Sequence, residues 1–164
     1  MHPKGAYFTR GSGHTKHGAY TEDSAAYQDV VDRLLVKWET ARTLVPEAEI
    51  EYSKFNKAAI LTVGSGGAAC REALDRLKAD NVGLNYCRVR AFPFTAAVKD
   101  FIEKHEVVYV VEQNRDAQLR TLLILDAEGD PKKLVPLLHY NGMPINTGFV
   151  VDAVQNEISK GRAA

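Results

Sequence analysis

The fold is decided by residues 58–74, which read AAILTVGSGGAACREAL. The apolar run over 58–63 predicts a short strand that stops at the glycine-rich residues 64–67. Beyond these glycines, apolar residues recur from Ala69 to Leu77 at the spacing of one helical face. This stretch therefore predicts a strand, a tight turn and a helix.

The same alternation continues toward the C-terminus. Strands are predicted over 84–92 and 106–112, and the second is apolar throughout, as is typical of a central parallel strand covered on both faces. A further strand over 134–140 is restricted to a sheet edge by Pro136, which cannot donate to a ladder. Helices are predicted between the strands, one beginning near Asp116. This pattern predicts a three-layer α/β fold, Rossmann-like, with a mostly parallel, doubly wound sheet.

The residues before this alternation have a different character. Residues 1–22 are rich in glycine and polar side chains without an apolar period, which indicates an N-terminal arm or linker. Residues 23–46 have the apolar spacing of a linking helix, capped by Asp23 or Ser24 and ended by Pro46. Residues 47–164 form the predicted α/β domain.

Charge and cysteine content exclude several classes of partner. The 21 Lys and Arg residues balance the 21 Asp and Glu residues, so neither a nucleic acid nor a membrane is predicted as a partner. No apolar run approaches the roughly 20 residues that span a bilayer. Cys70 and Cys87 fall in a predicted helix and a predicted strand, which favours a reducing cytoplasm. Two cysteines are also too few for an iron–sulfur cluster, which generally takes four.

The glycine-rich turn has two interpretations. Residues 64–69 read GSGGAA, which satisfies the G-x-G-x-x-A pattern of a dinucleotide site between a strand and a helix. The second strand ends in Arg88 and Arg90 with no acidic residue for a ribose hydroxyl, so only an NADP-like variant would fit. The alternative interpretation is a close strand-to-helix turn without a ligand.

A polar cluster follows the central strand. Glu112, Asn114, Arg115 and Asp116 stand where the strand runs into its loop, and ligands or partners of α/β folds usually bind at the carboxyl ends of parallel strands. These four residues are therefore candidates for an interdomain or ligand contact. In the alternative interpretation Asn114 and Asp116 cap the next helix, while Arg115 pairs with a neighbouring carboxylate.

No catalytic or metal site is predicted within the chain. His14 and His17 form an H-x-x-H pair without a visible third ligand, and His105 ends a predicted helix, where an imidazolium would favour the helix dipole. The serines lie at caps or in loops, and neither cysteine has a histidine or lysine next to it in sequence.

Five sequence strings, taken together, are specific enough to indicate one protein family. They are YFTRGSGH (7–14), YTED (20–23), KWETA (37–41), RVRAFPF (88–94) and VVEQNRDAQL (110–119). In this order they resemble the final segment of the α subunit of 2-oxoglutarate:ferredoxin oxidoreductases, and the resemblance runs from about Tyr7 to the closing helix. Relatives often carry an acidic residue after the GSGH string, whereas Thr15 and Lys16 stand here.

The resemblance implies a transketolase C-terminal-like fold and a role in a larger enzyme. In that family, thiamine diphosphate and Mg²⁺ lie where the pyrimidine-binding domain of the α subunit meets the β subunit, which carries an iron–sulfur cluster. Electrons pass to ferredoxin and coenzyme A takes the acyl group. The resemblance thus implies a cofactor-free assembly domain, inactive alone, whose partners are the remaining α-subunit domains, the β subunit and, in a dimer, a second α subunit.

Two residues of the arm follow from the resemblance as candidates for substrate contact. Arg10 and His14 are expected near the substrate carboxylate or the coenzyme A phosphates, because an arginine fork matches either anion. Two other functions stay open. The chain could be an NADP-binding Rossmann-like domain, or a free-standing interaction module.

Overall fold

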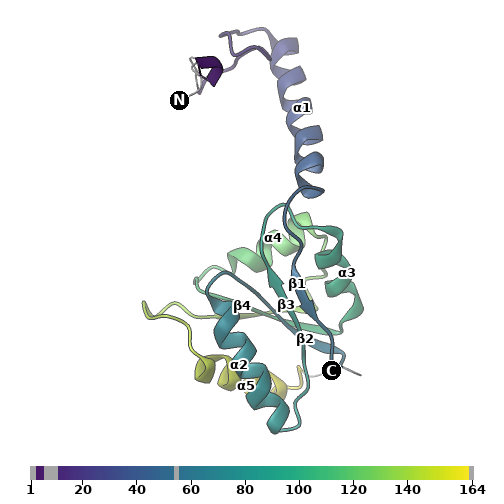
Figure 1. The fold of residues 1–164 in the computed structure, drawn as a ribbon, viewed down its shortest axis with the longest axis vertical. Coiled ribbons are helices and arrows are strands. Elements are labelled where there is room, and N and C mark those ends of the chain that lie inside the picture. The colour runs from purple at the N-terminus through teal and green to yellow at the C-terminus, as the bar shows by residue number, and fades with distance from the viewer. Residues whose placement is uncertain (1–2, 6–10, 54–55, 163–164) are drawn as a thin grey trace. The chain divides into compact units, whose positions relative to one another are not determined.

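The computed structural model describes residues 3–5, 11–53 and 56–162. The chain divides into two compact units, Met1–Leu44 and Val45–Ala164 (Figure 1). The first unit contains a short 3-10 helix, η1 (Pro3–Gly5), and the helix α1 (Ser24–Arg42). The carboxylate of Asp23 caps α1 by accepting a hydrogen bond of 2.7 Å from the backbone N–H of Ala26. The helix ends at Arg42, and the backbone N–H of the C-cap residue Thr43 donates to the carbonyl oxygen of Thr40 at 3.1 Å.

The second unit is built on one five-stranded sheet. Its strands are β1 (Glu49–Glu51), β2 (Ala58–Val63), β3 (Asn85–Val89), β4 (Val107–Glu112) and β5 (Leu134–Leu138), in the spatial order β1-β3-β2-β4-β5. The last four are parallel, and β1 runs antiparallel to β3. In the register of the two central strands, Ile60 lies opposite Tyr109. This sheet confirms the predicted mostly parallel α/β fold.

Four helices cover the two faces of the sheet (Figure 1). They are α2 (Gly66–Ala79), α3 (Ala96–Lys104), α4 (Gln118–Asp126) and α5 (Thr147–Ser159). The buried side chains of α2 and α5 pack on one face of the sheet, and those of α3 and α4 pack on the other. This arrangement gives the three layers predicted from the sequence. None of the helices formed by the described residues is both long and apolar enough to cross a membrane.

The two edge strands show what the sequence could and could not indicate. Strand β5 stands at the end of the sheet and pairs with β4, which confirms the edge position predicted from Pro136. Strand β1 was not predicted, because Glu49-Ile50-Glu51 is too short and too charged to give an apolar run. It is fixed instead by its pairing with β3, where Ile50 lies opposite Cys87.

His105 differs from the role predicted for it. The side chain is buried rather than charged at a helix end, and its Nδ1 lies 2.6 Å from the carbonyl oxygen of Phe101. Its Nε2 lies 2.7 Å from the side-chain nitrogen of Asn85, which can only donate. Nε2 therefore accepts and Nδ1 donates, so the ring is neutral. Burial accordingly lowers the pKa of His105 below its ordinary value. The prediction of an imidazolium at this position was wrong.

Candidate functional site

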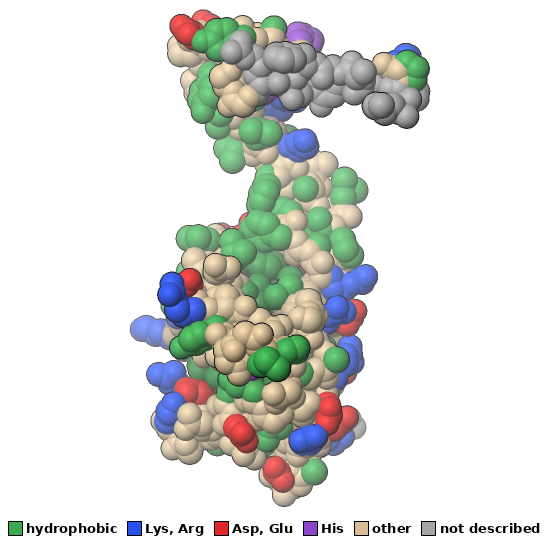
Figure 2. All heavy atoms as spheres, turned by 90° about the vertical axis from the view of Figure 1, so that its left-hand side faces the viewer, with side chains coloured by type: hydrophobic (Ala, Val, Ile, Leu, Met, Phe, Trp, Pro, Cys, Tyr) green, Lys and Arg blue, Asp and Glu red, His purple; other side chains and the backbone are tan. Residues whose placement is uncertain are grey.

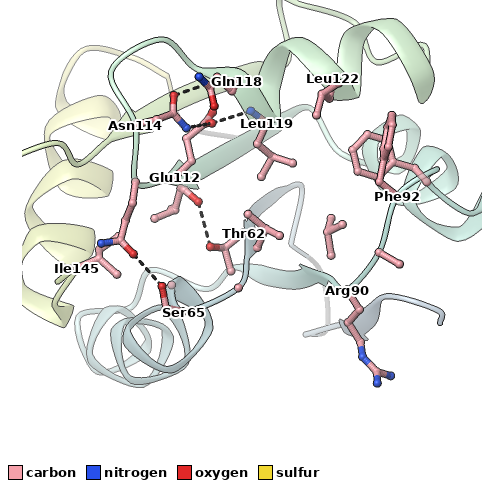
Figure 3. A pocket seen from close by; sticks show the side chains of 18 residues that line it. Thr62, Ser65, Arg90, Phe92, Glu112, Asn114, Gln118, Leu119, Leu122 and Ile145 are labelled. Atoms are coloured by element: carbon pink, nitrogen blue, oxygen red, sulfur yellow. Dashed lines mark hydrogen bonds between the residues drawn. The ribbon is translucent and has the colours of Figure 1, made fainter. Parts of the chain in front are cut away.

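A cavity of the second unit lies at the carboxyl ends of β2, β3 and β4. Neighbouring strands β2 and β4 lead into α2 and α4, which cover opposite faces of the sheet. Such a reversal leaves a crevice beyond the strand ends, where open α/β folds usually bind their ligands. A cavity of about 540 Å³ occupies this crevice (Figure 3). We call it the carboxyl-edge cavity.

Apolar side chains form most of the wall of the carboxyl-edge cavity. They come from the ends of β2, β3 and β4, from α4 and from the segment before α5, and they are Val63, Val89, Phe92, Phe94, Val111, Leu119, Leu122 and Ile145. Phe92 packs edge-on against Phe94, with ring centroids 5.1 Å apart. Figure 3 shows Phe92, Leu119 and Leu122 around one side of the open space. Sequence reasoning missed these residues, although the ends of the predicted strands pointed to this region.

Glu112 organises the polar corner of the cavity. The residue is 3% exposed, and its carboxylate accepts hydrogen bonds from the backbone N–H groups of Leu119 and Arg120, at 2.7 and 3.2 Å. It also accepts a bond of 2.6 Å from the side-chain amide of Asn114. A buried carboxylate with three donors and a position at a helix start is a helix cap. Glu112 therefore holds the N-terminus of α4 in place.

Asn114 adds a second cap to α4. Its side-chain oxygen accepts from the backbone N–H groups of Asp116 and Gln118, at 3.0 and 3.1 Å. Ala117 adopts a left-handed backbone conformation with φ of 52°, and α4 begins one residue later. The helix thus starts at Gln118, two residues after the start predicted near Asp116.

The two remaining candidates of this cluster, Arg115 and Asp116, contact each other rather than the cap of α4. Arg115 and Asp116 form an exposed ion pair, with Nε and Oδ1 2.7 Å apart. The alternative interpretation of the cluster was therefore right about Asn114 and Arg115. It was wrong about Asp116, whose carboxylate pairs with Arg115 instead of capping the helix.

The glycines of the turn before α2 have structural explanations. Gly64 has a φ of +61°, which favours glycine. A Cβ at Gly66 would lie 2.6 Å from the hydroxyl oxygen of Thr62, and a Cβ at Gly67 would lie 2.8 Å from Cδ of Arg88. Two of the three glycines are thus needed for packing against the protein itself. The close-turn interpretation accounts for the motif without a dinucleotide.

A hydrogen bond crosses the crevice between the loops after β2 and β4. The hydroxyl of Ser65 donates to the side-chain oxygen of Gln113 at 2.8 Å. Nearby, the buried hydroxyl of Thr62 donates to the carbonyl oxygen of Val111 at 3.0 Å. Figure 3 shows both bonds at the border of the carboxyl-edge cavity. The side chains that make these two bonds are neutral hydroxyls and an amide.

An arginine cluster lies beside the cavity. Glu49 of β1 is 3.2 Å from Arg71, 3.1 Å from Arg88 and 3.8 Å from Arg90. The hydrogen bond from Arg71 is the main reason that the pKa of Glu49 lies below its ordinary value. These pairs attach the edge strand β1 to β3 and α2. They account for the arginines at the end of β3 without a bound phosphate.

The described residues bring no nucleophile and base together. Burial raises the pKa of the Cys70 and Cys87 thiols to about 12, so neither thiol is ionised near neutral pH. Within residues 3–5, 11–53 and 56–162, no three His, Cys, Asp or Glu side chains are grouped as metal ligands.

The two candidates of the arm belong to the first unit. Arg10 lies outside the described residues. His14 is half-buried, pairs with Tyr20 in an isolated antiparallel bridge and places its Nδ1 2.7 Å from the carbonyl oxygen of Thr15. Their expected contacts with an anionic ligand stay predictions.

Comparison with known proteins gives two informative similarities. No protein-family profile matches the chain. The 2-oxoacid:ferredoxin oxidoreductase subunit alpha of Saccharolobus solfataricus is 24% identical over 156 residues, which are 92% of this chain and 24% of that subunit. The structure of the 2-oxoglutarate:ferredoxin oxidoreductase from Magnetococcus marinus with 2-oxoglutarate, coenzyme A and succinyl-CoA bound aligns with a TM-score of 0.77 and 23% identity. That alignment covers 95% of this chain and 27% of the aligned one.

The chain is similar to the α subunit of a 2-oxoacid:ferredoxin oxidoreductase. This similarity confirms the resemblance predicted from the five sequence strings. The α chain of a probable 2-oxoacid ferredoxin oxidoreductase from Thermoplasma acidophilum also aligns, but its TM-score of 0.48 is too low to carry an argument. The chain spans about a quarter of the length of the first two oxidoreductases that it matches.

Proposed function

We propose that this chain is the C-terminal assembly domain of the α subunit of a thiamine-diphosphate-dependent 2-oxoglutarate:ferredoxin oxidoreductase. The proposal rests on one observation above the others. Nearly the whole chain matches an oxidoreductase α subunit by sequence and an oxidoreductase by structure, and each match takes up about a quarter of the relative. The parent enzyme would convert 2-oxoglutarate to succinyl-CoA and reduce ferredoxin.

The buried polar groups of the second unit support an architectural role. Glu112 is committed to capping α4, and Asn85 and His105 satisfy each other. These hydrogen bonds hold α4 and the amino end of the sheet in place, which is the work of a structural domain. In such an enzyme, thiamine diphosphate, Mg²⁺ and an iron–sulfur cluster supply the chemistry, and other domains and the β subunit hold them. This chain would be inactive alone.

Exposed apolar side chains at the carboxyl edge support a docking role. Three of them line the cavity, where Val63, Phe92 and Leu122 are 42%, 41% and 40% exposed. Contiguous exposed apolar surface marks protein contacts. On the face of the second unit drawn in Figure 2, hydrophobic side chains occupy the middle, and charged ones lie toward its two sides. We propose that the remaining α-subunit domains cover the carboxyl edge.

The same proposal assigns a role to each of the other candidate residues. The exposed pair Arg115–Asp116 would contact a neighbouring domain rather than substrate. Arg10 and His14 of the arm would approach the substrate carboxylate or coenzyme A. A cytoplasmic location, a β-subunit partner, ferredoxin as electron acceptor and a dimer of α subunits belong to the same proposal.

Purification of the natural gene product tests the assembly. The gene is tagged at the 3′ end in its own organism, and the product is purified under anaerobic conditions. We expect an α polypeptide longer than 164 residues, together with a second subunit that contains thiamine diphosphate and iron. A tagged product of 18.1 kDa that purifies without a partner would overturn the proposal.

A ligand titration separates this proposal from the NADP-binding alternative. A ligand that binds only the folded state must raise its melting temperature. We expect NADPH at micromolar concentrations to leave the melting temperature of the 164-residue chain unchanged, because the turn glycines and the strand-end arginines are engaged within the protein. A clear rise with NADPH that the same concentration of adenosine does not produce would favour the dinucleotide site.

A further inference from the structure

We propose that the carboxyl-edge cavity binds a neutral, flat heterocycle of the nucleobase type. This site goes beyond the proposed function. In the assembled subunit the domains that cover the carboxyl edge would enclose the bound ligand, whereas the 164-residue chain alone leaves the cavity accessible. The volume of about 540 Å³ lies within the range of roughly 300–1,000 Å³ that is usual for small-molecule pockets. Its place beyond the carboxyl ends of β2 and β4 is also the usual ligand position in an open α/β sheet.

The walls of the cavity fit a flat apolar body. Leu119 and Leu122 come from α4, while Phe92 comes from the segment after β3 and keeps its ring edge-on to Phe94. In Figure 3 the side chains of Phe92, Leu119 and Leu122 border the same open space. Aromatic and branched apolar side chains in this arrangement bury the faces of a ring system and gain the area-dependent free energy of removing it from water.

The polar border of the cavity fits a neutral ligand with donors and acceptors on one edge. Gln113 and Gln118 carry amides, which both donate and accept, and such amides pair with the edge of a nucleobase. The carboxylate of Glu112 is already occupied by three N–H donors. The guanidinium of Arg90 is directed away from the cavity in Figure 3 and is paired with Glu49. No uncompensated charge among these groups faces the ligand.

Binding of adenosine to the 164-residue chain tests this site. Adenosine is titrated into the ¹⁵N-labelled chain by NMR, and its affinity is measured by calorimetry. We expect saturable binding, with the largest shifts at backbone amides that line the cavity, including those of Gly64, Gln113 and Leu119. Absence of binding at millimolar adenosine, or shifts gathered elsewhere, would overturn the proposal.

Two leucines of the same helix provide a matched pair of variants. Leu122 lines the cavity, whereas Leu125 is exposed on α4 and does not line it. Leu122→Arg places a long charged side chain at the mouth and is expected to weaken adenosine binding roughly tenfold or more. Leu125→Arg is expected to leave the affinity within about twofold of the unaltered chain. Equal effects of the two variants would contradict binding in the cavity.

A comparison of adenosine with AMP tests the neutral character of the ligand. We expect AMP to bind no more than a few-fold more tightly than adenosine, because the cavity border has no unpaired cation for the phosphate. An affinity for AMP more than roughly tenfold higher would show that a phosphate site governs binding. That result would overturn the assignment of a neutral ligand.

Discussion

Both ends of the parallel sheet hold a buried polar side chain with all its hydrogen bonds made, but the surroundings of the two side chains differ. At the amino end, Asn85 uses its entire side chain: it donates to the carbonyl oxygen of Asn56 and to His105, and it accepts from the backbone N–H of Ser53. At the carboxyl end, Glu112 is equally saturated, but the side chains around it leave a cavity. The comparison teaches that a saturated polar group can either be enclosed by its partners, as Asn85 is, or stand beside a cavity that can take a ligand or partner, as Glu112 does.

The largest effect is expected when the cap at the carboxyl end is removed. Glu112→Ala deprives two backbone N–H groups of α4, including that of buried Leu119, of their acceptor. Because unsatisfied buried donors are costly, the free energy of unfolding should fall by about 3 kcal/mol. Urea unfolding of the 164-residue chain measures this loss.

A neighbouring carboxylate provides the control for that variant. Asp116→Ala removes only an exposed ion pair with Arg115 and should change the free energy of unfolding by less than about 0.5 kcal/mol. If both variants lost similar stability, the carboxyl end would not depend on Glu112, and the contrast between the two ends would fail.

An intermediate effect is expected where α2 packs against β2. Gly66→Ala brings a methyl group against the buried hydroxyl of Thr62, so it should cost about 1–2 kcal/mol although alanine favours helices. Thr62→Ala removes the obstacle. The double variant should therefore be less destabilised than the sum of the single variants. Strict additivity in thermal unfolding would show that this close approach does not explain the glycine.

The smallest effect is expected from protonation at the amino end. Burial holds the pKa of His105 below the value of 6.5 that is usual for histidine. Below about pH 6.5 the unfolded chain therefore binds a proton that the folded chain does not, so stability should decrease as the pH falls through this range.

Urea unfolding between pH 7.5 and 5 measures this dependence. His105→Gln should lose that part of the pH dependence, whereas the exposed His17→Gln should keep it. A pH dependence that survived in His105→Gln would place the responsible group elsewhere and remove the buried histidine from the comparison.

The sequence predicted the strands that carry a clear local signal, such as an apolar run or a proline. The unbroken run Val107–Val111 indicated a central strand, and Pro136 indicated an edge, because both signals are local. Strand β1 gave no such signal, since its charged Glu49 and Glu51 are held by arginines distant in sequence. Local patterns thus established the layers, and the remaining strand required tertiary contacts.

The sequence pointed to the position of the candidate site in the fold but not to most of its residues and contacts. The carboxyl end of β4 was identified, yet the role of Glu112 depends on N–H groups seven and eight residues further along the chain. The cavity likewise combines Val63, Phe92 and Leu122, which come from three separate segments. No spacing rule brings such residues together, so only the folded structure could identify the site.

The most direct test of the account is the reduction of ferredoxin by the 164-residue chain alone. The chain is supplied under anaerobic conditions with 2-oxoglutarate, thiamine diphosphate, Mg²⁺ and coenzyme A, and a cooperative thermal transition verifies that it is folded. An assembly domain that relies on neighbouring polypeptide for its chemistry should give the same rate as the mixture without protein. Measurable turnover of 2-oxoglutarate by this chain would contradict the account.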